Sequence, residues 1–383
     1  MRMLVLGAGL QGSACAFDLL QNPVVSEVRL ADLHTGHLPD FLNEYSGGRL
    51  IPTVLDVRNR EAAMALMRES DAVMSAIPYY FNLELARMAV EAKAHFCDLG
   101  GNTEIVFQQK QLAERAKEAN VTVIPDCGLA PGMVNILAQH GIEQLDRVRS
   151  VKIFVGGLPQ HPEPPLGYQI VYSLEGVLDY YTTRSWVVRD GKRAQVPALS
   201  ERERVEFPKP VGELEAFHTA GGLSTMAFRY EGKIPTMEYK TLRYPGHAQI
   251  MEAIRELGLL DLVPVDVKGI KVVPRDLFVA TVSPRLTKPL GRDLVALRVT
   301  VEGTKNGKAK RLGWELLDFY DEARGISAMM RTTGFSLSIT GQMQARRAIP
   351  PGVWTPDECI PAPEYIAELA RRGVYIKTLG TGD

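Results

Sequence analysis

The 383-residue chain has few cysteines, no excess of either charge and no long apolar run, and each of these shortages excludes a class of protein. Its four cysteines (Cys15, Cys97, Cys127 and Cys359) are widely spaced and form no C-x-x-C pair, so we expect neither a disulfide framework nor a zinc site. Reduced thiols are typical of the cytoplasm, and we expect the protein to be cytoplasmic.

Charge is balanced, with 44 basic and 45 acidic side chains and a formal net charge of −1. Such a chain has no field that would hold a polyanion, which argues against nucleic acid and anionic membrane as partners. No apolar stretch is long enough to span a bilayer, and Asp18 and three glycines interrupt the apolar start where a signal peptide would be uniform. A small molecule is therefore the expected partner.

Residues 1–130 alternate short apolar runs with amphipathic segments. The expected strands are residues 3–6, 28–31, 53–55, 72–76, 95–97 and 121–124, and the expected helices are residues 11–20, 59–68, 83–92 and 104–119. Alternation of this length indicates βαβ units in a parallel sheet. The pattern predicts an α/β fold that begins with a doubly wound Rossmann domain.

The pattern changes after Pro131, and residues 131–333 are expected to form a second, α+β domain with a mixed or antiparallel sheet. A helix is expected over 132–140 and a strand over 148–157, followed by hairpins over 186–196 and 295–316 and helices over 249–257 and 275–285. The hairpins are predicted from Asp190-Gly191 and Asn306-Gly307, because these pairs supply the positive φ of tight turns. This domain is expected to bind substrate, and its apolar strands favour a homo-oligomer.

The C-terminal residues 334–383 are helical in pattern, with helices expected over 334–347 and 364–371. We expect this tail to pack back on the first domain.

A glycine-rich turn, Gly7-Ala8-Gly9-Leu10-Gln11-Gly12, directly follows the first strand and opens the first helix. Gly7 permits the tight turn, Gly9 lets a pyrophosphate approach the backbone, and Gly12 lets the helix pack closely on the strand. Free N–H groups at the helix start, including those of Leu10 and Gln11, favour bound phosphate. The turn therefore predicts a dinucleotide site.

Asp32 ends the second strand, twenty residues after Gly12. A carboxylate at this position accepts hydrogen bonds from the ribose hydroxyls and repels a 2′-phosphate, and neither Leu33 nor His34 is a cation that would receive that phosphate. The sequence therefore favours NAD over NADP.

Other strand ends fall on the same edge of the sheet, where ligands of open α/β folds bind. Asp56 follows the third strand and either faces the adenine or caps the next helix. The segment Ala76-Ile77-Pro78 ends the fourth strand beside the expected nicotinamide ribose. Asp98-Leu99-Gly100-Gly101 ends the fifth, so Asp98 is a catalytic candidate, placed to hold substrate or ribose, and Gly100 is a candidate nucleotide contact. Asp126, after the sixth strand, is expected to cap the helix that begins near Pro131.

Several blocks in order along the chain resemble the saccharopine dehydrogenase-like family. They are the glycine turn, Asp98-Leu99-Gly100-Gly101, Gly128-Leu129-Ala130-Pro131-Gly132, Gly156-Gly157-Leu158-Pro159, Pro165-Leu166-Gly167-Tyr168 and Thr241-Leu242-Arg243-Tyr244. Within the family, the blocks Pro125–Met133, Ser173–Gly176 and Phe217–Gly222 are most similar to the L-lysine 6-dehydrogenases. Saccharopine-forming members typically carry Asp at Ala130, Asp-His at Val134-Asn135 and Cys at Val155, which argues against saccharopine as the substrate.

The resemblance implies an NAD-dependent amino-acid dehydrogenase. Its reaction would be oxidative deamination of L-lysine at the ε-carbon to the 6-semialdehyde, which cyclises to piperideine-6-carboxylate. The reacting amine must be neutral, so a base or a desolvated site is needed, and the α-carboxylate needs a cation, preferably a bidentate Arg.

Candidates for these roles cluster between residues 168 and 247. Arg243 is the expected carboxylate clamp, unless its strand simply turns alternate residues to solvent. His218 is a candidate acid or base, because histidine titrates near neutral pH, and Lys240 is a second catalytic candidate. Further substrate contacts are expected from His247, Tyr168 and Glu175, although a packing role for Tyr168 and a helix-start charge at Glu175 are open alternatives.

Two rival functions stay open. One is a reductase of the same family that joins or splits an amine and an aldehyde, as saccharopine and carboxynorspermidine enzymes do. The other is a non-catalytic NAD-binding protein. The carboxylate at Asp32 argues against the NADPH-dependent reductases, and the polar richness of residues 215–247 argues against a protein without chemistry.

Overall fold

A computed structural model describes residues 1–45, 48–288 and 291–380 of the chain. The chain divides into two compact units. Unit 1 comprises Met1–Gln144, Ser224–Arg229 and Asp321–Ile376, and unit 2 comprises Leu145–Leu223, Tyr230–Tyr320 and the C-terminal residues from Lys377. The predicted tail of residues 334–383 therefore contributes mainly to unit 1, and its residues 381–383 lie outside the described part of the chain.

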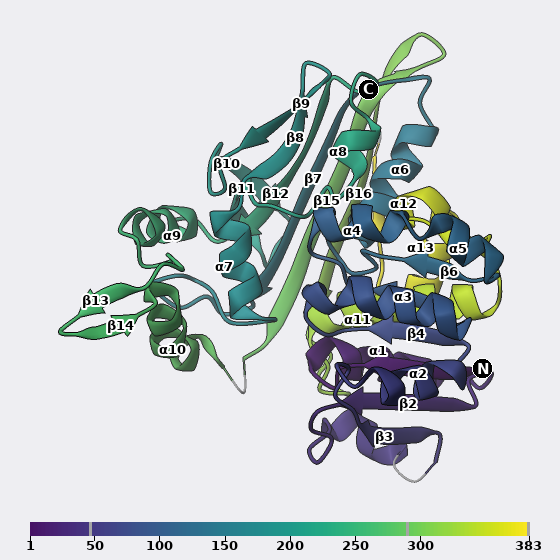
Figure 1. Cartoon of the computed structure of the whole chain (residues 1–383). Coiled ribbons are helices and arrows are strands. Elements are labelled where there is room, and N and C mark those ends of the chain that lie inside the picture. Colours follow the sequence, from purple (N-terminus) through teal and green to yellow (C-terminus); the bar gives the residue numbers. More distant parts are fainter. Residues whose placement is uncertain (46–47, 289–290, 381–383) are drawn as a thin grey trace. The chain divides into compact units, whose positions relative to one another are not determined.

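Unit 1 is an α/β structure around a parallel sheet in the order β17-β6-β5-β4-β1-β2-β3 (Figure 1). Its strands are β1 (Arg2–Leu6), β2 (Glu27–Asp32), β3 (Leu50–Val54), β4 (Ala72–Ser75), β5 (His95–Asp98), β6 (Thr122–Ile124) and β17 (Gly352–Val353). Its α-helices are α1 (Leu10–Gln21), α2 (Arg60–Arg68), α3 (Asn82–Ala92), α4 (Thr103–Lys110), α5 (Ala113–Glu118), α6 (Met133–Glu143), α8 (Met226–Arg229), α11 (Ala328–Ala345), α12 (Pro356–Cys359) and α13 (Ala362–Arg371). Short 3-10 turns lie at Asp40–Tyr45 and Tyr79–Phe81. The predicted doubly wound sheet is confirmed.

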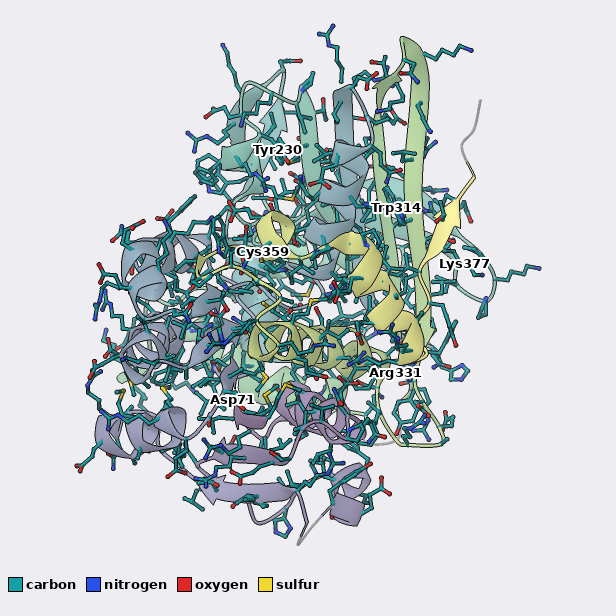
Figure 2. The ribbon with its side chains drawn as sticks, turned by 90° about the vertical axis from the view of Figure 1, so that its right-hand side faces the viewer. Asp71, Tyr230, Trp314, Arg331, Cys359 and Lys377 are labelled. Atoms are coloured by element: carbon teal, nitrogen blue, oxygen red, sulfur yellow. The ribbon has the colours of Figure 1, made fainter. Side chains whose placement is uncertain are left out.

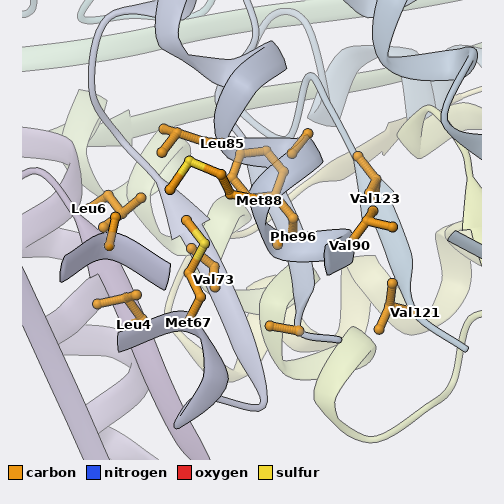
Figure 3. Close-up of a cluster of buried hydrophobic side chains, with 14 of the residues drawn as sticks. Leu4, Leu6, Met67, Val73, Leu85, Met88, Val90, Phe96, Val121 and Val123 are labelled. Carbon is orange, nitrogen blue, oxygen red and sulfur yellow. The ribbon is translucent and has the colours of Figure 1, made fainter. Parts of the chain in front are cut away.

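Both faces of this sheet are covered at its central strands, where consecutive residues of β1, β4, β5 and β6 are buried. On one face, side chains such as Leu4, Leu6 and Phe96 pack with Leu85 and Met88 of α3 (Figure 3). On the other face α11 is so close that a Cβ added at Gly341 would lie 2.4 Å from the Met74 sulfur.

Three boundaries in unit 1 differ from expectation. The helix expected over residues 104–119 is two helices, α4 and α5, because the chain turns at Gln111 and Leu112 between them. The third strand begins at Leu50 and ends before the predicted residue 55. A seventh strand, β17, comes from residue 352 and pairs in parallel with β6, a long-range pairing that no local pattern indicates.

Unit 2 contains a mixed sheet in the order β10-β11-β12-β7-β15-β16-β18, with β8 and β9 attached through β12. The strands are β7 (Arg147–Pro159), β8 (Ser185–Arg189), β9 (Lys192–Val196), β10 (Glu203–Phe207), β11 (Gly212–His218), β12 (Thr236–Arg243), β15 (Asp293–Lys305), β16 (Lys308–Phe319) and β18 (Lys377–Leu379). β12 and β7 are parallel and the other neighbours are antiparallel, so the predicted mixed sheet is confirmed. At its edge, β18 pairs with β16, with Lys377 opposite Glu315 and Thr378 opposite Trp314 (Figure 2).

The helices of unit 2 are α7 (Leu174–Thr182), α9 (His247–Glu256) and α10 (Pro274–Leu286), and a separate hairpin joins β13 (Val265–Val267) to β14 (Ile270–Val272). Both predicted hairpins form, with φ of +49° at Asp190 and +51° at Asn306 in their turns. Among the described residues, no helix is both long and apolar enough to cross a bilayer.

Candidate functional site

The glycine turn between β1 and α1 has the backbone geometry of a phosphate cradle. Gly7 has φ of +100°, and a Cβ at Gly12 would lie 1.8 Å from the Gly7 carbonyl oxygen, so both positions require glycine. Gly9 differs, because a Cβ there would meet no heavy atom within 4 Å. It is exposed at the N-cap of α1, where a phosphate can approach the free N–H groups.

Asp32 lies directly beside this turn. Its Oδ2 accepts a hydrogen bond from the Ala8 N–H at 2.7 Å, and its Oδ1 accepts one from the His34 N–H at 3.1 Å. A carboxylate oxygen has two lone pairs, so both oxygens retain acceptor capacity for ribose hydroxyls. The side chain is half-buried and reachable by a ligand.

The remaining predicted nucleotide contacts surround the same turn, with two exceptions, Asp56 and Gly100. Leu10 is 51% exposed at the first position of α1, and the side-chain oxygen and nitrogen of Gln11 are buried without a hydrogen-bond partner. Ala76 and Ile77 pack against the glycines, and Pro78 is exposed. An unpaired buried amide is costly, which is an independent sign that a polar ligand belongs here.

Gly100 lies instead beside the carboxyl groups after β5 and β6, where its N–H donates to Asp98. Asp56 is engaged at the surface with Arg58. The two side chains lie 2.6 Å apart, and this pairing lowers the pKa of Asp56 to about 2. The alternative prediction, that Asp56 caps the next helix, is wrong, since the side chain of Asn59 accepts the cap hydrogen bond from the Ala62 N–H.

A buried pair of carboxyl groups lies at the carboxyl ends of β5 and β6. Asp98 accepts hydrogen bonds from the Gly100 N–H at 2.7 Å and from the Gln109 side-chain amide at 2.7 Å. The backbone N–H of Asp126 donates to Asp98 Oδ1 at 3.5 Å. Burial raises the pKa of Asp98 to about 6, although both of its oxygens are hydrogen-bonded.

Asp126 has the less satisfied carboxyl group of the two. The Ser224 hydroxyl donates to its Oδ2, while Oδ1 is buried without a hydrogen-bond partner. Its backbone is left-handed, with φ of +64°, a conformation that non-glycine residues seldom adopt outside turns and functional sites. Burial raises the pKa of Asp126 to about 7, which suits a group that exchanges a proton near neutral pH.

The predicted helix-capping role of Asp126 is wrong. α6 begins after Gly132, whose N–H donates to the Asn135 side chain at 2.7 Å. Asp126 was therefore missed as a candidate site residue, although its place at a strand end on the ligand-binding edge was the signal. Ser224, nearly a hundred residues further along the chain, has no local signal.

In unit 2, Arg243 is buried in an aromatic cluster at the end of β12. Its guanidinium carbon lies 4.9 Å from the centre of the Tyr168 ring, and its Nη1 donates to the Leu242 carbonyl oxygen at 2.8 Å. The ring of His247 lies 5.6 Å from that of Tyr168, and its Nε2 is 3.0 Å from the Tyr181 hydroxyl. The fold thus brings together three residues of the predicted substrate site.

No carboxylate within the described residues pairs with Arg243, which is 2% exposed, and its Nε and the Tyr168 hydroxyl lack hydrogen-bond partners. The alternative that this strand faces solvent is wrong, because Met237 to Arg243 are all buried. His247 stays neutral beside Arg243, because burial, and then the charge of Arg243, lower the pKa of His247 to about 3. A buried cation without an anion predicts an anionic ligand.

Glu175, also predicted to bind substrate, lies in the exposed first turn of α7. That helix starts with its Ser173 N-cap, and an acidic side chain in the first turn stabilises it.

His218 of β11 and Lys240 of β12 are paired residues on neighbouring strands, and charged side chains surround them. Lys240 and Arg243 point to opposite faces of β12. His218 Nδ1 is 3.1 Å from the Tyr239 carbonyl oxygen and its Nε2 is 3.1 Å from Glu201. The Lys240 ammonium donates to Glu203 at 2.6 Å. Burial lowers the pKa of His218. Their catalytic roles stay predictions, and these contacts fit a structural network.

Glu201, His218 and Glu238 offer ligand atoms within 4.8 Å of one another, a spacing that would suit a metal ion. The Arg189 guanidinium already binds both carboxylates, at 2.8 Å from Glu201 and 2.6 Å from Glu238. A protein cation therefore takes the place that a metal would need.

Sequence comparison decides the family. Residues 3–124 match the NADP-binding domain of saccharopine dehydrogenase, and residues 128–374 match the saccharopine dehydrogenase C-terminal domain. The chain belongs to the saccharopine dehydrogenase family. The resemblance noted in the sequence is thereby confirmed, and unit 1 carries the family's dinucleotide-binding domain.

Family members of known activity differ in substrate. The L-glutamate-forming, NADP-dependent saccharopine dehydrogenase of Pyricularia oryzae is 27% identical over 220 residues, which cover 55% of this chain and 48% of that protein. Carboxynorspermidine synthase of Vibrio alginolyticus is 22% identical over 336 residues, covering 81% and 80%. The chain spans about half the length of the saccharopine dehydrogenases that it matches.

The apo structure of the L-glutamate-forming saccharopine dehydrogenase from Saccharomyces cerevisiae has the same fold. It superposes with a TM-score of 0.80 at 21% identity, covering 100% of both chains.

Proposed function

We propose that this family member is an NAD-dependent amino-acid dehydrogenase that oxidises L-lysine at its ε-carbon. Removal of a hydride from that carbon and a proton from the amine leaves an imine. Water hydrolyses the imine to ammonia and the 6-semialdehyde, whose aldehyde condenses with its own α-amine to give piperideine-6-carboxylate. Unit 1 would bind the nucleotide and unit 2 the amino acid.

The single observation that carries the substrate class is the unpaired buried cation of Arg243. A guanidinium presents two parallel N–H donors to a carboxylate, and this pairing is among the stronger contacts in proteins. The aromatic rings of Tyr168 and its neighbours exclude water, which strengthens the attraction. An amino-acid α-carboxylate is the anion that the family relationship supports.

NAD as the cofactor is supported by the turn and by Asp32. The open position at Gly9 and the unpaired amide of Gln11 fit a pyrophosphate and its ribose, and the Asp32 carboxylate disfavours a 2′-phosphate. When bound, the nicotinamide ring supplies the hydride acceptor. The chain's own residues then have to bind, orient and deprotonate the amine.

Asp126 is the best-supported base for that proton. Its buried Oδ1 is free to accept a proton, and a pKa of about 7 leaves the group partly ionised near neutral pH. Ser224 holds Oδ2 and so orients the carboxyl group.

A second candidate function, reductive joining of an amine and an aldehyde, is favoured by the long match to carboxynorspermidine synthase. The two proposals differ in cofactor and substrate. The test supplies L-lysine, other amino acids, saccharopine, and amine–aldehyde pairs with NAD or NADP, and follows the absorbance of the reduced nicotinamide.

Reduction of NAD by L-lysine is the expected result. NADPH oxidation by an amine–aldehyde pair would favour the second candidate, and saccharopine-dependent turnover would replace lysine as the substrate. If no member of the panel reacts, the catalytic assignment fails.

Arg243 gives a sharper test of the same proposal. Arg243→Met removes the cation and should raise KM for the amino acid by about 10- to 100-fold, the usual value of a charge-assisted contact, with little change in KM for NAD. Arg243→Lys keeps the charge but loses the two parallel N–H donors, so its KM for the amino acid should lie between those of the wild type and Arg243→Met. The matched control is Arg204→Met, an 82% exposed arginine of the same sheet. An amino-acid KM unchanged in Arg243→Met removes this residue from the site.

A further inference from the structure

Unit 1 contains a second concave region, at the C-terminal end of α1. The cavity has a volume of about 680 Å³. Its walls come from α1 and the residues after it, from α11, and from α13 and the chain that follows. The lining includes Phe17, Asp18, Gln21, Asn22, Arg324, Arg331, Phe335, Gln342, Arg346, Glu368, Arg371, Arg372 and Tyr375. The part of its wall on α1 that lies nearest the glycine turn is Phe17, eight residues after Gly9, so roughly 12 Å of helix separates the two.

Arginine dominates the charge of this cavity. Five guanidinium groups line it, and three carboxylates serve them, Asp18 and Glu368 in the wall and Asp321 behind it. Glu368 alone is shared by Arg346, Arg371 and Arg372, at 3.8, 2.6 and 2.6 Å. The guanidinium groups that line the cavity therefore outnumber the carboxylates that line it.

The arginines divide into two layers. Arg372 is deep, with 14% of its side chain exposed, and it binds Asp18 at 2.7 Å, so it joins α13 to α1. Arg331, on α11, is similarly deep at 10% exposure (Figure 2). Arg324, Arg346 and Arg371 form the rim, with side chains 58%, 42% and 67% exposed.

The guanidinium groups at the rim have more N–H donors than their contacts with the described residues use. Each guanidinium carries five N–H groups. Arg371 donates to Glu368, and Arg346 donates to the Gln342 carbonyl oxygen and lies 3.8 Å from Glu368. Behind the rim, the stacked rings of Phe17 and Phe335 form an apolar floor, with ring centres 6.4 Å apart. A ligand would thus meet cationic forks at the entrance and an apolar surface at the base.

We propose that this cavity is a binding site for a small multivalent anion, held by the rim guanidiniums of Arg324, Arg346 and Arg371. Several guanidinium groups around one cavity suit an anion that carries more than one negative charge, and planar forks suit phosphate and carboxylate oxygens. A phosphate ester and a polycarboxylate share this chemistry. The site would link α1, α11 and α13, and it does not depend on the proposed function.

The test is calorimetric titration of the full chain at low ionic strength with two probes, inorganic pyrophosphate and citrate. Both probes are multivalent, so binding of either to the wild type is expected, and added salt should weaken it. Stronger binding of pyrophosphate assigns the site to phosphate esters, and stronger binding of citrate assigns it to polycarboxylates.

The double variant Arg346→Gln/Arg371→Gln should weaken the bound probe by at least about tenfold for each lost charge-assisted contact. Arg346→Lys/Arg371→Lys, which keeps the charges without the forks, should bind with intermediate affinity. The control, Arg68→Gln/Arg115→Gln, removes two exposed arginines elsewhere in unit 1 and should bind as the wild type does.

Two outcomes overturn the proposal. One is the absence of binding of both probes to the wild type. The other is equal affinity in the wild type and the Arg346→Gln/Arg371→Gln variant, since pyrophosphate would then be bound at the intact glycine turn or elsewhere. Thermal unfolding of each variant without probe checks that the substituted proteins are folded.

Discussion

Single side chains decide where the chemistry of this protein can occur, and Asp126 is the most informative of them. Two carboxyl groups, Asp98 and Asp126, are buried at neighbouring strand ends, yet they differ in how their oxygens are used. Each oxygen of Asp98 accepts a hydrogen bond, whereas Oδ1 of Asp126 accepts none. A base needs an available oxygen, so the roles of the pair follow from their hydrogen bonds.

We predict that Asp126→Asn lowers kcat by about 10²- to 10⁴-fold, the usual contribution of a positioned base. The pKa of about 7 predicts that wild-type kcat/KM rises with pH through that value, because the base must be unprotonated. The residual activity of the variant should lack this limb. Initial rates between about pH 5 and pH 9 measure both, and Asp98→Asn is the matched comparison. A rising limb near pH 7 that persists in Asp126→Asn would assign the titration to another group.

The same raised pKa has a consequence for stability. Burial raises the pKa of Asp126 from its ordinary value of 3.8 to about 7, so between about pH 4 and pH 7 the folded protein holds a proton that the unfolded chain has lost. This group therefore lowers the free energy of unfolding as pH rises through that interval. We therefore predict that the free energy of unfolding of Asp126→Asn, minus that of the wild type, is more positive at about pH 8 than at about pH 4. Urea unfolding at the two pH values measures this difference.

At the level of helices and strands, Gly9 and Gly12 of the same turn are glycine for different physical reasons. Gly12 is needed for packing, since its Cβ would overlap the Gly7 carbonyl oxygen. Gly9 has normal backbone angles, φ −73° and ψ −169°, and free space around it. Only the ligand, therefore, requires glycine at position 9.

We predict that Gly12→Ala lowers the melting temperature, or prevents folding, because α1 must move away from β1. Gly9→Ala should melt as the wild type does but bind NAD at least about tenfold more weakly, because the methyl group occupies the path of the pyrophosphate. Differential scanning calorimetry and fluorescence titration with the reduced nucleotide measure the two effects. Equal NAD affinity in Gly9→Ala and wild type would mean that phosphate does not approach at this position.

The elements also show what a sequence can reveal. The glycine turn, Asp32 and the alternation of strands and helices are local signals, and they predicted the Rossmann sheet and its ligand edge. β17 and the contact of Ser224 with Asp126 depend on residues more than ninety positions apart, for which local periodicity carries no information. β12 reads as an alternating polar strand, but it is buried on both faces because charged neighbours neutralise Lys240 and Glu238. Burial of this kind depends on partners that are distant in sequence.

For the chain as a whole, the main physical fact is that unit 1 is discontinuous in sequence. Strands β1 to β6 and helix α1 come from the first 144 residues, whereas β17 and α11 come from the C-terminal part. Sixteen of the 18 residues of α11 are buried, and this helix crosses α1 so closely that a Cβ at Gly334 would lie 2.7 Å from the Ala14 side chain. Without α11, one face of the parallel sheet would be exposed to water, which parallel sheets do not tolerate.

We therefore predict that a fragment of residues 1–144 does not form a cooperatively folded domain, although it contains the whole glycine turn. It should bind a hydrophobic dye and unfold in urea without a sharp transition, because burial of apolar surface is incomplete. Joining residues 321–376 to it through a flexible Gly/Ser linker restores α11 and β17, and should restore a cooperative transition. If the fragment of residues 1–144 alone unfolds cooperatively, the stability of the Rossmann sheet resides in its own helices, and α11 is an addition to a unit that is already complete.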